Sequence, residues 1–396
     1  MSPDPIVVCA AVRTPLGRYL GELSPLPAHR LGAHAIRAAL QRAGAAPERI
    51  DEALMGCVLG AGQGQAPARQ AARAAGLPDS VPAVTINKVC GSGMKAAMQA
   101  HDALIAGSIE VAVAGGMESM SNAPYLLQRA RAGYRVGHDR IFDHMALDGL
   151  EDAYEPGRAM GEFGEALARE YGFDRAAQDA YAHETLRRAQ AAIEHGDFAD
   201  EIAPIQIEDK AGARTVQHDE HPRKVSLDKI AALKPAFAAD GSITAASASA
   251  NADGAAALLL TWRSTAMREG WPALARIVAH ASHSQAPAQY TTAPIPAVRK
   301  LLARAGWNVG DVDLFEINEA FAAVAMAAAH DLGIARERLN VNGGACALGH
   351  PIGATGARLL VTLIHALRRR GGRRGVAALC IGGGEATAMA VEIEPA

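Results

Sequence analysis

The feature that most constrains this chain is an alternation of short apolar segments with helix-length segments, joined by glycine-rich turns. Apolar runs at residues 5–12, 83–87 and 110–114 predict strands that are covered on both faces. Residues 30–42 and 94–106 have the spacing of apolar side chains typical of helices. This alternation predicts an α/β fold with a mostly parallel sheet and helices on its faces.

The pattern changes between about residues 122 and 245. Polar segments at 159–171 and 175–194 predict helices, and proline-containing loops surround them. Strand–helix alternation then resumes near residue 254. With 396 residues the chain is long enough for two or three domain-sized units. We therefore expect a sheet domain that carries an insertion.

A weak internal repeat indicates two related halves. Gly91–Gly93 is expected to open a helix in the first half, and Gly349–Gly353 to open one in the second. The stretch Val113–Glu118 is likewise similar in sequence to Ile381–Glu385. Each pair is expected to place a glycine-rich bend at the carboxyl end of a strand, where α/β sheets bind ligands. Both halves are thus predicted to direct their loops toward one site.

Composition and charge exclude several classes of protein. Hydrophobic residues make up 49% and charged residues 20%, which is typical of a globular protein. The net charge is −3, and the basic cluster at 368–374 sits where a helix is expected to end, so no nucleic-acid partner is predicted. Five cysteines without CxxC spacing predict neither a disulfide framework nor a metal site. No leader or membrane-spanning segment is visible, which favours the cytoplasm.

Cys90 is the strongest candidate nucleophile. It follows a predicted strand and precedes a predicted helix, where unpaired backbone N–H groups and the helix dipole favour a thiolate. Gly91 and Gly93 allow close approach of a substrate or of another backbone. A cysteine is more often a small buried hydrophobic residue, but the strand–turn–helix context here favours the nucleophile.

His350 lies in a second glycine-rich turn and is the candidate base. Pro351 after it favours an extended conformation at His350, so the imidazole is expected to point out of the turn. A lone histidine is usually structural or exposed. The density of glycine between Gly343 and Gly356 is hard to explain by packing, and a base that activates a thiol is the better interpretation.

Asn318 and Cys380 each have two possible roles. Asn318 precedes a predicted helix, where asparagine is a good N-cap, although its side chain could also position a water. Cys380 closes an apolar strand and could be inert. The glycines at 382–384 after it would expose backbone N–H groups, which are the components of an oxyanion hole. The residues alone therefore indicate a cysteine enzyme with a histidine base, without indicating its substrate.

Five blocks in order identify a family resemblance: Asn87–Ala96, Gly115–Ser121, Asn318–Ala322, Gly349–Arg358 and Cys380–Gly384. The chain resembles the thiolases over nearly its whole length, and it is most similar to those that condense acetyl-CoA. The resemblance implies two βαβαβαββ halves in a five-layer α-β-α-β-α core. Residues 1–121 with 250–270 would form the first half, 122–249 a loop domain that grips CoA, and 271–396 the second half.

The resemblance also implies roles for individual residues. Cys90 would accept the acyl group, His350 would activate it, and Cys380 would move the α-proton of acetyl-CoA. Asn318 and His350 would form one oxyanion hole, and the backbone N–H groups of Cys90 and Gly382 a second. The implied reaction is the reversible condensation of two acetyl-CoA molecules to acetoacetyl-CoA and CoA, without a cofactor, in a homodimer or homotetramer.

The implied CoA contacts are spread over the insertion and the second half: Arg223, Ala236, Phe237, Ser249, Leu150, Met160 and Phe321. The chain departs from the family pattern at Ala159, Ser247 and Tyr290, and at Glu385 and Ala386 after the glycines. These departures leave the acyl preference open. The alternatives are a 3-oxoacyl-CoA thiolase for longer chains, a condensing enzyme that uses an acyl carrier protein, and a non-catalytic acyl-CoA-binding scaffold.

Overall fold

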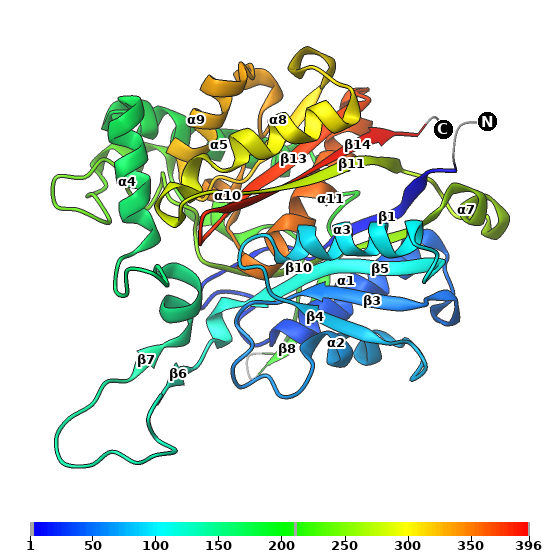
Figure 1. The fold of residues 1–396 in the computed structure, drawn as a ribbon, viewed down its shortest axis with the longest axis horizontal. Helices are drawn as coiled ribbons and strands as arrows, with labels where there is room; N and C mark the ends of the chain where they lie inside the picture. Colours follow the sequence, from blue (N-terminus) through cyan, green and yellow to red (C-terminus); the bar gives the residue numbers. More distant parts are fainter. Residues whose placement is uncertain (1–3, 210–211, 395–396) are drawn as a thin grey trace.

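The computed structural model describes residues 4–209 and 212–394. The few terminal residues of the two predicted halves, 1–3 and 395–396, lie outside the described residues. Ten strands join in one sheet with the order β12-β13-β14-β11-β1-β10-β5-β3-β4, with β2 beside β10. Figure 1 shows this sheet folded into two layers, with helices between the layers and on both outer sides.

The first half follows a βαβαβαββ order. Its elements are β1 (Ile6–Arg13), α1 (Ala28–Ala43), β3 (Glu52–Gly56), α2 (Pro67–Ala75), β4 (Ala83–Ile86), α3 (Ser92–Ile105), β5 (Val111–Ser119) and β10 (Ala252–Trp262). The short strand β2 (Gly17–Arg18) pairs with β10. Gly44 ends α1 with φ 68°, a left-handed conformation that glycine adopts at little cost.

The second half repeats this order with one strand almost missing. It contains β11 (Ala275–Ser284), α8 (Pro294–Ala305), β12 (Leu314–Ile317), α9 (Ala322–Leu332), α10 (Ala345–Leu348), α11 (Ile352–Arg370), β13 (Arg374–Ile381) and β14 (Glu385–Ile393). The counterpart of β4 is reduced to a single parallel bridge between Phe315 and Leu339.

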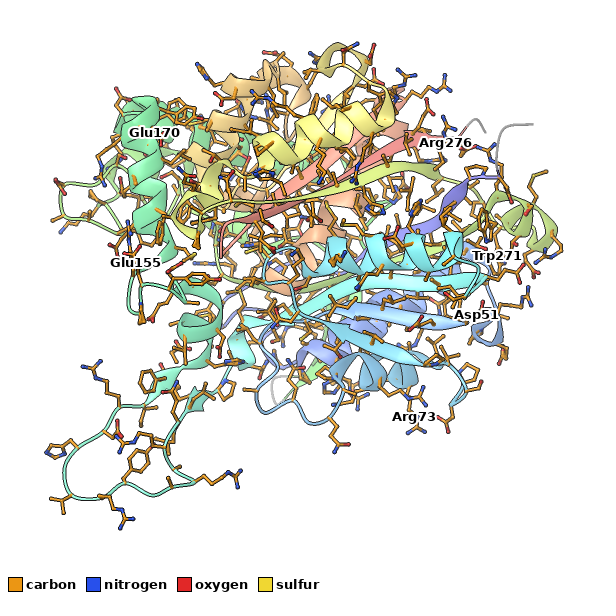
Figure 2. The ribbon with its side chains drawn as sticks, in the orientation of Figure 1. Asp51, Arg73, Glu155, Glu170, Trp271 and Arg276 are labelled. Atoms are coloured by element: carbon orange, nitrogen blue, oxygen red, sulfur yellow. The ribbon has the colours of Figure 1, made fainter. Side chains whose placement is uncertain are left out.

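Alternate strand residues face different helical layers, which explains the apolar runs. On β10, Leu259 packs with α1 and α2 on the outer side, whereas Leu258 and Leu260 face α3 and α11. On β13, Leu379 faces the same inner helices, and Val376 packs with α8 and α9. The two β layers and three helical layers give the predicted five-layer order. Charged side chains such as Arg73 and Glu170 lie on the outside (Figure 2).

The prediction of a mostly parallel sheet is wrong. Three strand pairs are parallel, β3–β4, β3–β5 and β12–β13. Six are antiparallel: β1–β10, β1–β11, β2–β10, β5–β10, β11–β14 and β13–β14. The last strand of each half, β10 or β14, inserts antiparallel beside the others. A strand buried on both faces is apolar in either direction, so the sequence pattern does not report its direction.

The segment between β5 and β10 forms small elements on top of the sheet layers. These are β6 (Tyr125–Leu126), β7 (Phe142–Asp143), α4 (Met160–Tyr171), α5 (Arg175–Glu194), β8 (Ile205–Asp209), β9 (Gly212–Val216) and α6 (Glu220–Lys224). Asp174 caps α5 by accepting a hydrogen bond from the N–H of Ala177 at 2.7 Å. The β6–β7 arm extends away from the body of the molecule (Figure 1). No helix in the part of the chain described here is long and apolar enough to cross a membrane.

Candidate active site

Close packing of α3 against α11 brings the two glycine-rich turns together. A Cβ atom on Gly93 would lie 2.9 Å from the backbone N of Ala357, and one on Gly356 would lie 2.4 Å from the backbone N of Met94. Real Cβ contacts are not this short, so the helices can touch only where both sequences have glycine. The N-terminal ends of α3 and α11, which follow Cys90 and His350, are thereby placed side by side.

The turn that carries Cys90 is held in a strained conformation by its own residues. Ser92 Oγ accepts a hydrogen bond from the N–H of Lys88 at 2.8 Å and donates one to the carbonyl of Val89 at 2.7 Å. Val89 has φ 46°, in the left-handed region that β-branched residues rarely adopt. Such a conformation costs about 1–3 kcal/mol and is typical of functional sites. The turn therefore fixes where the Cys90 thiol points.

The orientation and tautomer of His350 follow from its partners. Its backbone N–H donates to the carbonyl of Ala250 at 2.8 Å, and its Nδ1 lies 2.6 Å from Thr355 Oγ1. Thr355 in turn donates to the carbonyl of Pro351 at 3.0 Å. Since the hydroxyl has one proton, we assign it to the carbonyl and assign Nδ1 as the donor to the hydroxyl. Nε2 then carries the free lone pair, as a general base requires.

One narrow cavity of about 60 Å³ contains both thiols and the imidazole. Its twelve lining residues come from the insertion and from both halves: Cys90, Gly149, Leu150, Met160, Ser249, Tyr290, Ala320, Phe321, His350, Ile352, Cys380 and Gly382. On the same measure one water molecule needs about 10–15 Å³, so the cavity has room for a small group beside the thiols. Cys90, His350 and Cys380, which were expected to lie at one site, all line this cavity.

Cys380 and Gly382 reach the cavity from the end of β13. Cys380 is 1% exposed, and the turn after it continues through Gly383 at φ 96° and Gly384 at φ 90°. A side chain on Gly384 would collide with the carbonyl of Gln285, 2.3 Å from its Cβ position. The turn brings the backbone N–H of Gly382 to the sulfur of Cys90, where it lowers the pKa of that thiol. This N–H group is thus positioned to stabilise negative charge on the reacting sulfur or on an oxygen bound beside it.

Burial decides the resting protonation of the site. It raises the pKa of Cys90 to about 11, despite the opposing N–H groups of Gly382 and Cys90 itself. It also raises the pKa of Cys380 and lowers the pKa of His350 to about 3, with the Arg358 charge adding to the second effect. The expectation of a resting thiolate at Cys90 is therefore wrong: desolvation outweighs the helix entrance. Two neutral thiols and a neutral imidazole face the cavity.

Asn318 is buried without capping a helix. Helix α9 begins at Ala322 with Phe321 at its N-cap, so the interpretation of Asn318 as the N-cap is wrong. The backbone N–H of Asn318 donates to the carbonyl of Ala378 at 3.0 Å. Both polar atoms of its side chain are buried and have no hydrogen-bond partner among the residues that the structure describes. A buried amide of this kind is available to a water or a substrate oxygen.

The residues predicted to bind CoA fall into two groups. Leu150, Met160, Ser249 and Phe321 line the cavity, and the ring of Phe237 packs edge-on against Phe321 at a centroid distance of 5.6 Å. Arg223 on α6 and Ala236 in the following loop are both exposed and do not line the cavity. The first group could therefore contact the thioester end of a substrate, and the second only a more distant part.

Three buried polar residues that position the site were not predicted from the sequence. Glu118 at the end of β5 accepts hydrogen bonds from the N–H groups of Val58, Leu59 and Gly353, at 3.0, 3.1 and 2.8 Å. It thus holds the first turn of α11 against the first half. Thr355, described above, fixes the imidazole of His350. The sequence signal that could have identified Glu118 as a functional residue is its position as an acidic residue in an otherwise mostly apolar strand.

Glu319 is the third of these residues, and it joins the insertion to the second half. Its carboxylate accepts hydrogen bonds from Tyr181 Oη at 2.9 Å, Thr185 Oγ1 at 2.9 Å and Asn340 Nδ2 at 2.9 Å. Tyr181 and Thr185 lie on α5, and Glu319 directly follows Asn318. The network therefore fixes the backbone beside Asn318. It could not be predicted from the sequence, because Glu319 and its partners on α5 are more than a hundred positions apart.

The glycines at 115–116 do not form the bend predicted for them. They lie inside β5, which continues to Ser119. A Cβ atom on Gly116 would lie 2.1 Å from the carbonyl oxygen of Gly353 at the start of α11. The glycine is needed for this approach of α11 to the sheet and not for a turn.

The departures at Tyr290, Ser247 and Ala159 have different positions relative to the cavity. Tyr290 is 3% exposed, and its hydroxyl donates to the carbonyl of Met160 at 2.8 Å. Ser247 Oγ accepts a hydrogen bond from the N–H of Thr244 at 2.9 Å, so it stabilises a local turn. Ala159 is the N-cap residue of α4. Of the three, only Tyr290 lines the cavity directly.

Fold and site together define a five-layer α/β protein with two thiols and an imidazole in one cavity. The model of the thiolase N-terminal domain matches residues 6–264, and that of the thiolase C-terminal domain matches residues 271–393. This chain belongs to the thiolase family.

Relatives and a solved structure agree with this assignment over nearly the whole chain. An acetyl-CoA acetyltransferase of Cupriavidus necator is 48% identical, over 98% of this chain and 99% of the relative. One from Pseudomonas aeruginosa is 49% identical, over 97% and 98%. The crystal structure of the Bacillus anthracis acetyl-CoA acetyltransferase superposes with a TM-score of 0.95 at 42% identity, over 99% of both chains.

Proposed function

We propose that this protein is an acetyl-CoA C-acetyltransferase, which condenses two acetyl-CoA molecules reversibly to acetoacetyl-CoA and CoA through an acyl-cysteine. The observation that carries the proposal is the cavity shared by Cys90, His350 and Cys380. Its volume of about 60 Å³ suits an acetyl group. The names and full-length similarity of the relatives support the same reaction.

In the first half-reaction Cys90 takes the acetyl group. Nε2 of His350 removes the thiol proton while the sulfur attacks the thioester carbon. The carbon–sulfur bond to CoA then breaks, and the neutral thiol of Cys380 gives its proton to the departing CoA thiolate. Acetyl-Cys90, an imidazolium at His350 and a thiolate at Cys380 result. The resting neutrality of both thiols suits these roles, because one must lose a proton to the base and the other must donate one.

The second half-reaction forms the carbon–carbon bond and restores the site. The Cys380 thiolate removes a proton from the α-carbon of a second acetyl-CoA. The resulting enolate attacks the acetyl carbon on Cys90, and acetoacetyl-CoA leaves as the bond to the Cys90 sulfur breaks. The imidazolium of His350 returns its proton to that sulfur. All protons balance, and the proposed steps use only residues of the site and the CoA thioester substrates.

Both half-reactions develop negative charge on a thioester oxygen. The backbone N–H groups of Cys90 and Gly382 are proposed to bind one such oxygen. Asn318, through a water held by its unpartnered amide, is proposed to bind the other together with His350. Removing one donor of an oxyanion hole typically costs about 100- to 1000-fold in rate.

The CoA moiety is proposed to extend from the cavity over the insertion. Leu150, Met160, Ser249 and Phe321 would line the pantetheine end, with Phe237 behind Phe321. Ala236 and the exposed Arg223 would meet the nucleotide end. Arg223→Ala is therefore expected to raise KM for acetyl-CoA with little change in kcat, since it would weaken binding far from the reacting atoms. Loss of kcat with unchanged KM would contradict this placement.

Two variants separate the roles of the thiols. After mixing with acetyl-CoA, mass spectrometry of wild-type peptides is expected to show one acetyl group on the peptide of Cys90. Cys90→Ser is expected to lose this stable thioester adduct. Cys380→Ser is expected to retain an adduct, formed more slowly without its acid, and to lose condensation. No adduct in the wild type would contradict the proposal and favour a non-catalytic acyl-CoA-binding scaffold.

A 3-oxoacyl-CoA thiolase for longer chains is the second candidate, because Tyr290 lines the acyl cavity and could contact a longer chain. Thiolysis rates on acetoacetyl-CoA and on a C8 3-oxoacyl-CoA distinguish the two. Preference for the C8 substrate would favour this alternative.

We also propose that the chain works as a homodimer or homotetramer in the cytoplasm. Strand β4 lies at an edge of the sheet, with Val84 43% exposed, and an unpaired edge is a surface that proteins commonly cover. The β6–β7 arm carries further exposed apolar side chains, among them Tyr125, Val136 and Ile141. Sedimentation analysis is expected to give a mass of two or four chains. A monomer would contradict the assembly, and fractionation of its cells tests the location.

A further inference from the structure

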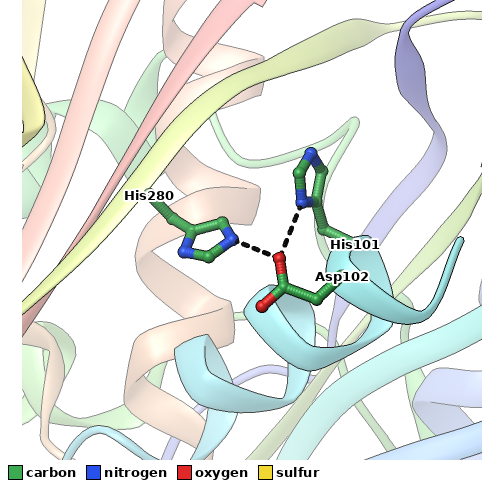
Figure 3. Close-up of side chains that lie close together, drawn as sticks. All are labelled: His101, Asp102 and His280. Atoms are coloured by element: carbon green, nitrogen blue, oxygen red, sulfur yellow. Dashed lines mark hydrogen bonds and ion pairs between the residues drawn. The ribbon is translucent and has the colours of Figure 1, made fainter. Parts of the chain in front are cut away.

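A second group of reactive side chains lies outside the catalytic cavity, where α3 meets β11. His101 and Asp102 are near the end of α3, and His280 is in the middle of β11 (Figure 3). Asp102 Oδ1 lies 3.3 Å from His101 Nδ1 and 2.8 Å from His280 Nε2. The two rings meet edge to face at a centroid distance of 5.2 Å. Two imidazole nitrogens thus contact the same carboxylate oxygen, and the three potential ligand atoms lie within 4.8 Å of one another.

We propose that His101, Asp102 and His280 form a binding site for a divalent transition metal ion, with Zn²⁺ as the best match. Two imidazoles and one carboxylate are a ligand set that suits Zn²⁺. In the part of the chain described by the structure, this is the one group of three such side chains whose ligand atoms lie within 4.8 Å of one another.

The geometry requires only a small adjustment. Metal–ligand distances of about 2.0–2.2 Å place tetrahedral ligand atoms about 3.4 Å apart. The two distances to Asp102 Oδ1 are already close to this value. The imidazole nitrogens, at most 4.8 Å apart, need to close by no more than about 1.4 Å. Rotation of the rings about their side-chain torsions can supply this movement.

The surroundings favour a cation at this position. The side chains of His101 and His280 are 17% and 16% exposed, whereas that of Asp102 is 57% exposed, so an ion could enter from solvent and keep a water ligand. The ligands also lie near the C-terminal end of α3, where the helix dipole favours positive charge.

The framework behind the ligands is fixed. Arg304 on α8 donates to the backbone carbonyl of His280 at 2.7 Å. The backbone carbonyl of Asp102 accepts the hydrogen bond from Ala106 that ends α3. Because α3 belongs to the first half and β11 to the second, a bound ion would connect the two halves. The site is not visible in the sequence, since Asp102 and His280 are 178 positions apart.

The test is titration of the metal-free full-length protein with ZnCl₂ and, for its spectrum, CoCl₂. One equivalent is expected to bind, and Co²⁺ is expected to show d–d bands without the near-ultraviolet charge-transfer band of a thiolate. The second criterion excludes binding at Cys90. His101→Gln and His280→Gln are expected to weaken Zn²⁺ binding at least about 100-fold, since even outer partners of a metal ligand contribute 10- to 100-fold. Zn²⁺ is expected to raise the Tm of the wild type but not of these variants.

Two further variants keep the test decisive. His330→Gln is the matched control, because His330 forms the same contact with the adjacent Asp331, Nδ1 to Oδ1 at 2.9 Å. Among the described residues, no second imidazole joins this pair. The variant should bind Zn²⁺ like the wild type. Asp102→Asn keeps an acceptor for both rings and removes the charge, so it should weaken Zn²⁺ binding without affecting folding. Unchanged binding in Asp102→Asn and His280→Gln, a thiolate band with Co²⁺, or no stoichiometric binding would overturn the proposal.

Discussion

At the scale of single residues, the state of Cys90 is the main departure from expectation. A helix entrance lowers the pKa of a thiol, but this sulfur lies in a narrow apolar cavity, and burial raises the pKa of Cys90 to about 11. His350 is also neutral, since burial lowers the pKa of its imidazole to about 3. The site is therefore charged only during the reaction, when the proton moves from sulfur to nitrogen.

This state predicts the pH dependence of alkylation at Cys90. Below its pKa the thiolate fraction grows tenfold per pH unit, so the rate of alkylation by iodoacetamide is expected to rise about tenfold per unit from pH 7 to pH 9. Peptide mapping would assign the modification to Cys90 and exclude the other cysteines. A rate that is already constant above neutral pH would show a thiolate–imidazolium pair in the free protein instead.

Tyr290 is predicted to limit the length of the acyl group. Its ring lines the cavity, and its hydroxyl is tied to the carbonyl of Met160. Tyr290→Met would remove the rigid ring, and kcat/KM for a C8 substrate relative to a C4 substrate is expected to rise about 10-fold or more, a typical effect of pocket size. Tyr290→Phe, which keeps the ring, should leave the ratio unchanged. An equal ratio in all three proteins would assign chain length to other residues.

At the scale of elements, the contact of α3 with α11 decides whether the site exists. Both Cys90 and His350 directly precede the helices that meet at Gly93 and Gly356, so the distance between the two turns depends on how closely these helices approach. The backbone of Met94 lies where a side chain on Gly356 would be. A glycine in a helix usually weakens it, and here the loss in helix stability is offset by the approach of the two catalytic turns.

Gly356→Ala is accordingly predicted to lower stability and activity together. The added methyl group would lie 2.4 Å from the backbone N of Met94, and overpacking of this kind typically costs about 1–3 kcal/mol. Urea unfolding and the rate of Cys90 acetylation measure the two effects. Gly310→Ala is the control, because no atom of the described part of the chain lies within 4 Å of its Cβ position. Equal stability of the two variants would show that α3 and α11 can separate without cost.

At the scale of the whole molecule, buried polar groups connect the insertion with both halves. Arg13 in β1 donates to Asp219 at 2.6 Å and to Glu201 at 2.6 Å, and all three side chains are fully buried. Glu319 makes a similar connection between α5 and the second half. The loss of one partner in such a group typically costs about 3–5 kcal/mol, because a charge remains buried without compensation.

Acid is predicted to destabilise the fold partly through His350. Its pKa is about 3 in the folded protein and close to 6.5 in the unfolded chain. Between these values the unfolded chain binds one more proton than the folded protein. The free energy of unfolding therefore decreases as the pH is lowered, by up to about 1.4 kcal/mol per pH unit. In His350→Gln the dependence of unfolding free energy on pH from 6.5 to 4 should be less steep. Identical slopes in variant and wild type would show that His350 does not contribute.

The sequence by itself determined the local elements and the chemistry-bearing residues. Apolar runs and helical spacing predicted β1, α1 and β4 to within a few residues, and the polar segment at 175–194 predicted α5, because side-chain periodicity acts over short distances. The family blocks likewise pointed to Cys90 and His350. Only the tertiary structure decided the antiparallel direction of β10 and β14, the role of Gly116, and the neutral state of Cys90. Strand direction, close approach and desolvation depend on residues that are distant in the chain, so no local pattern reports them.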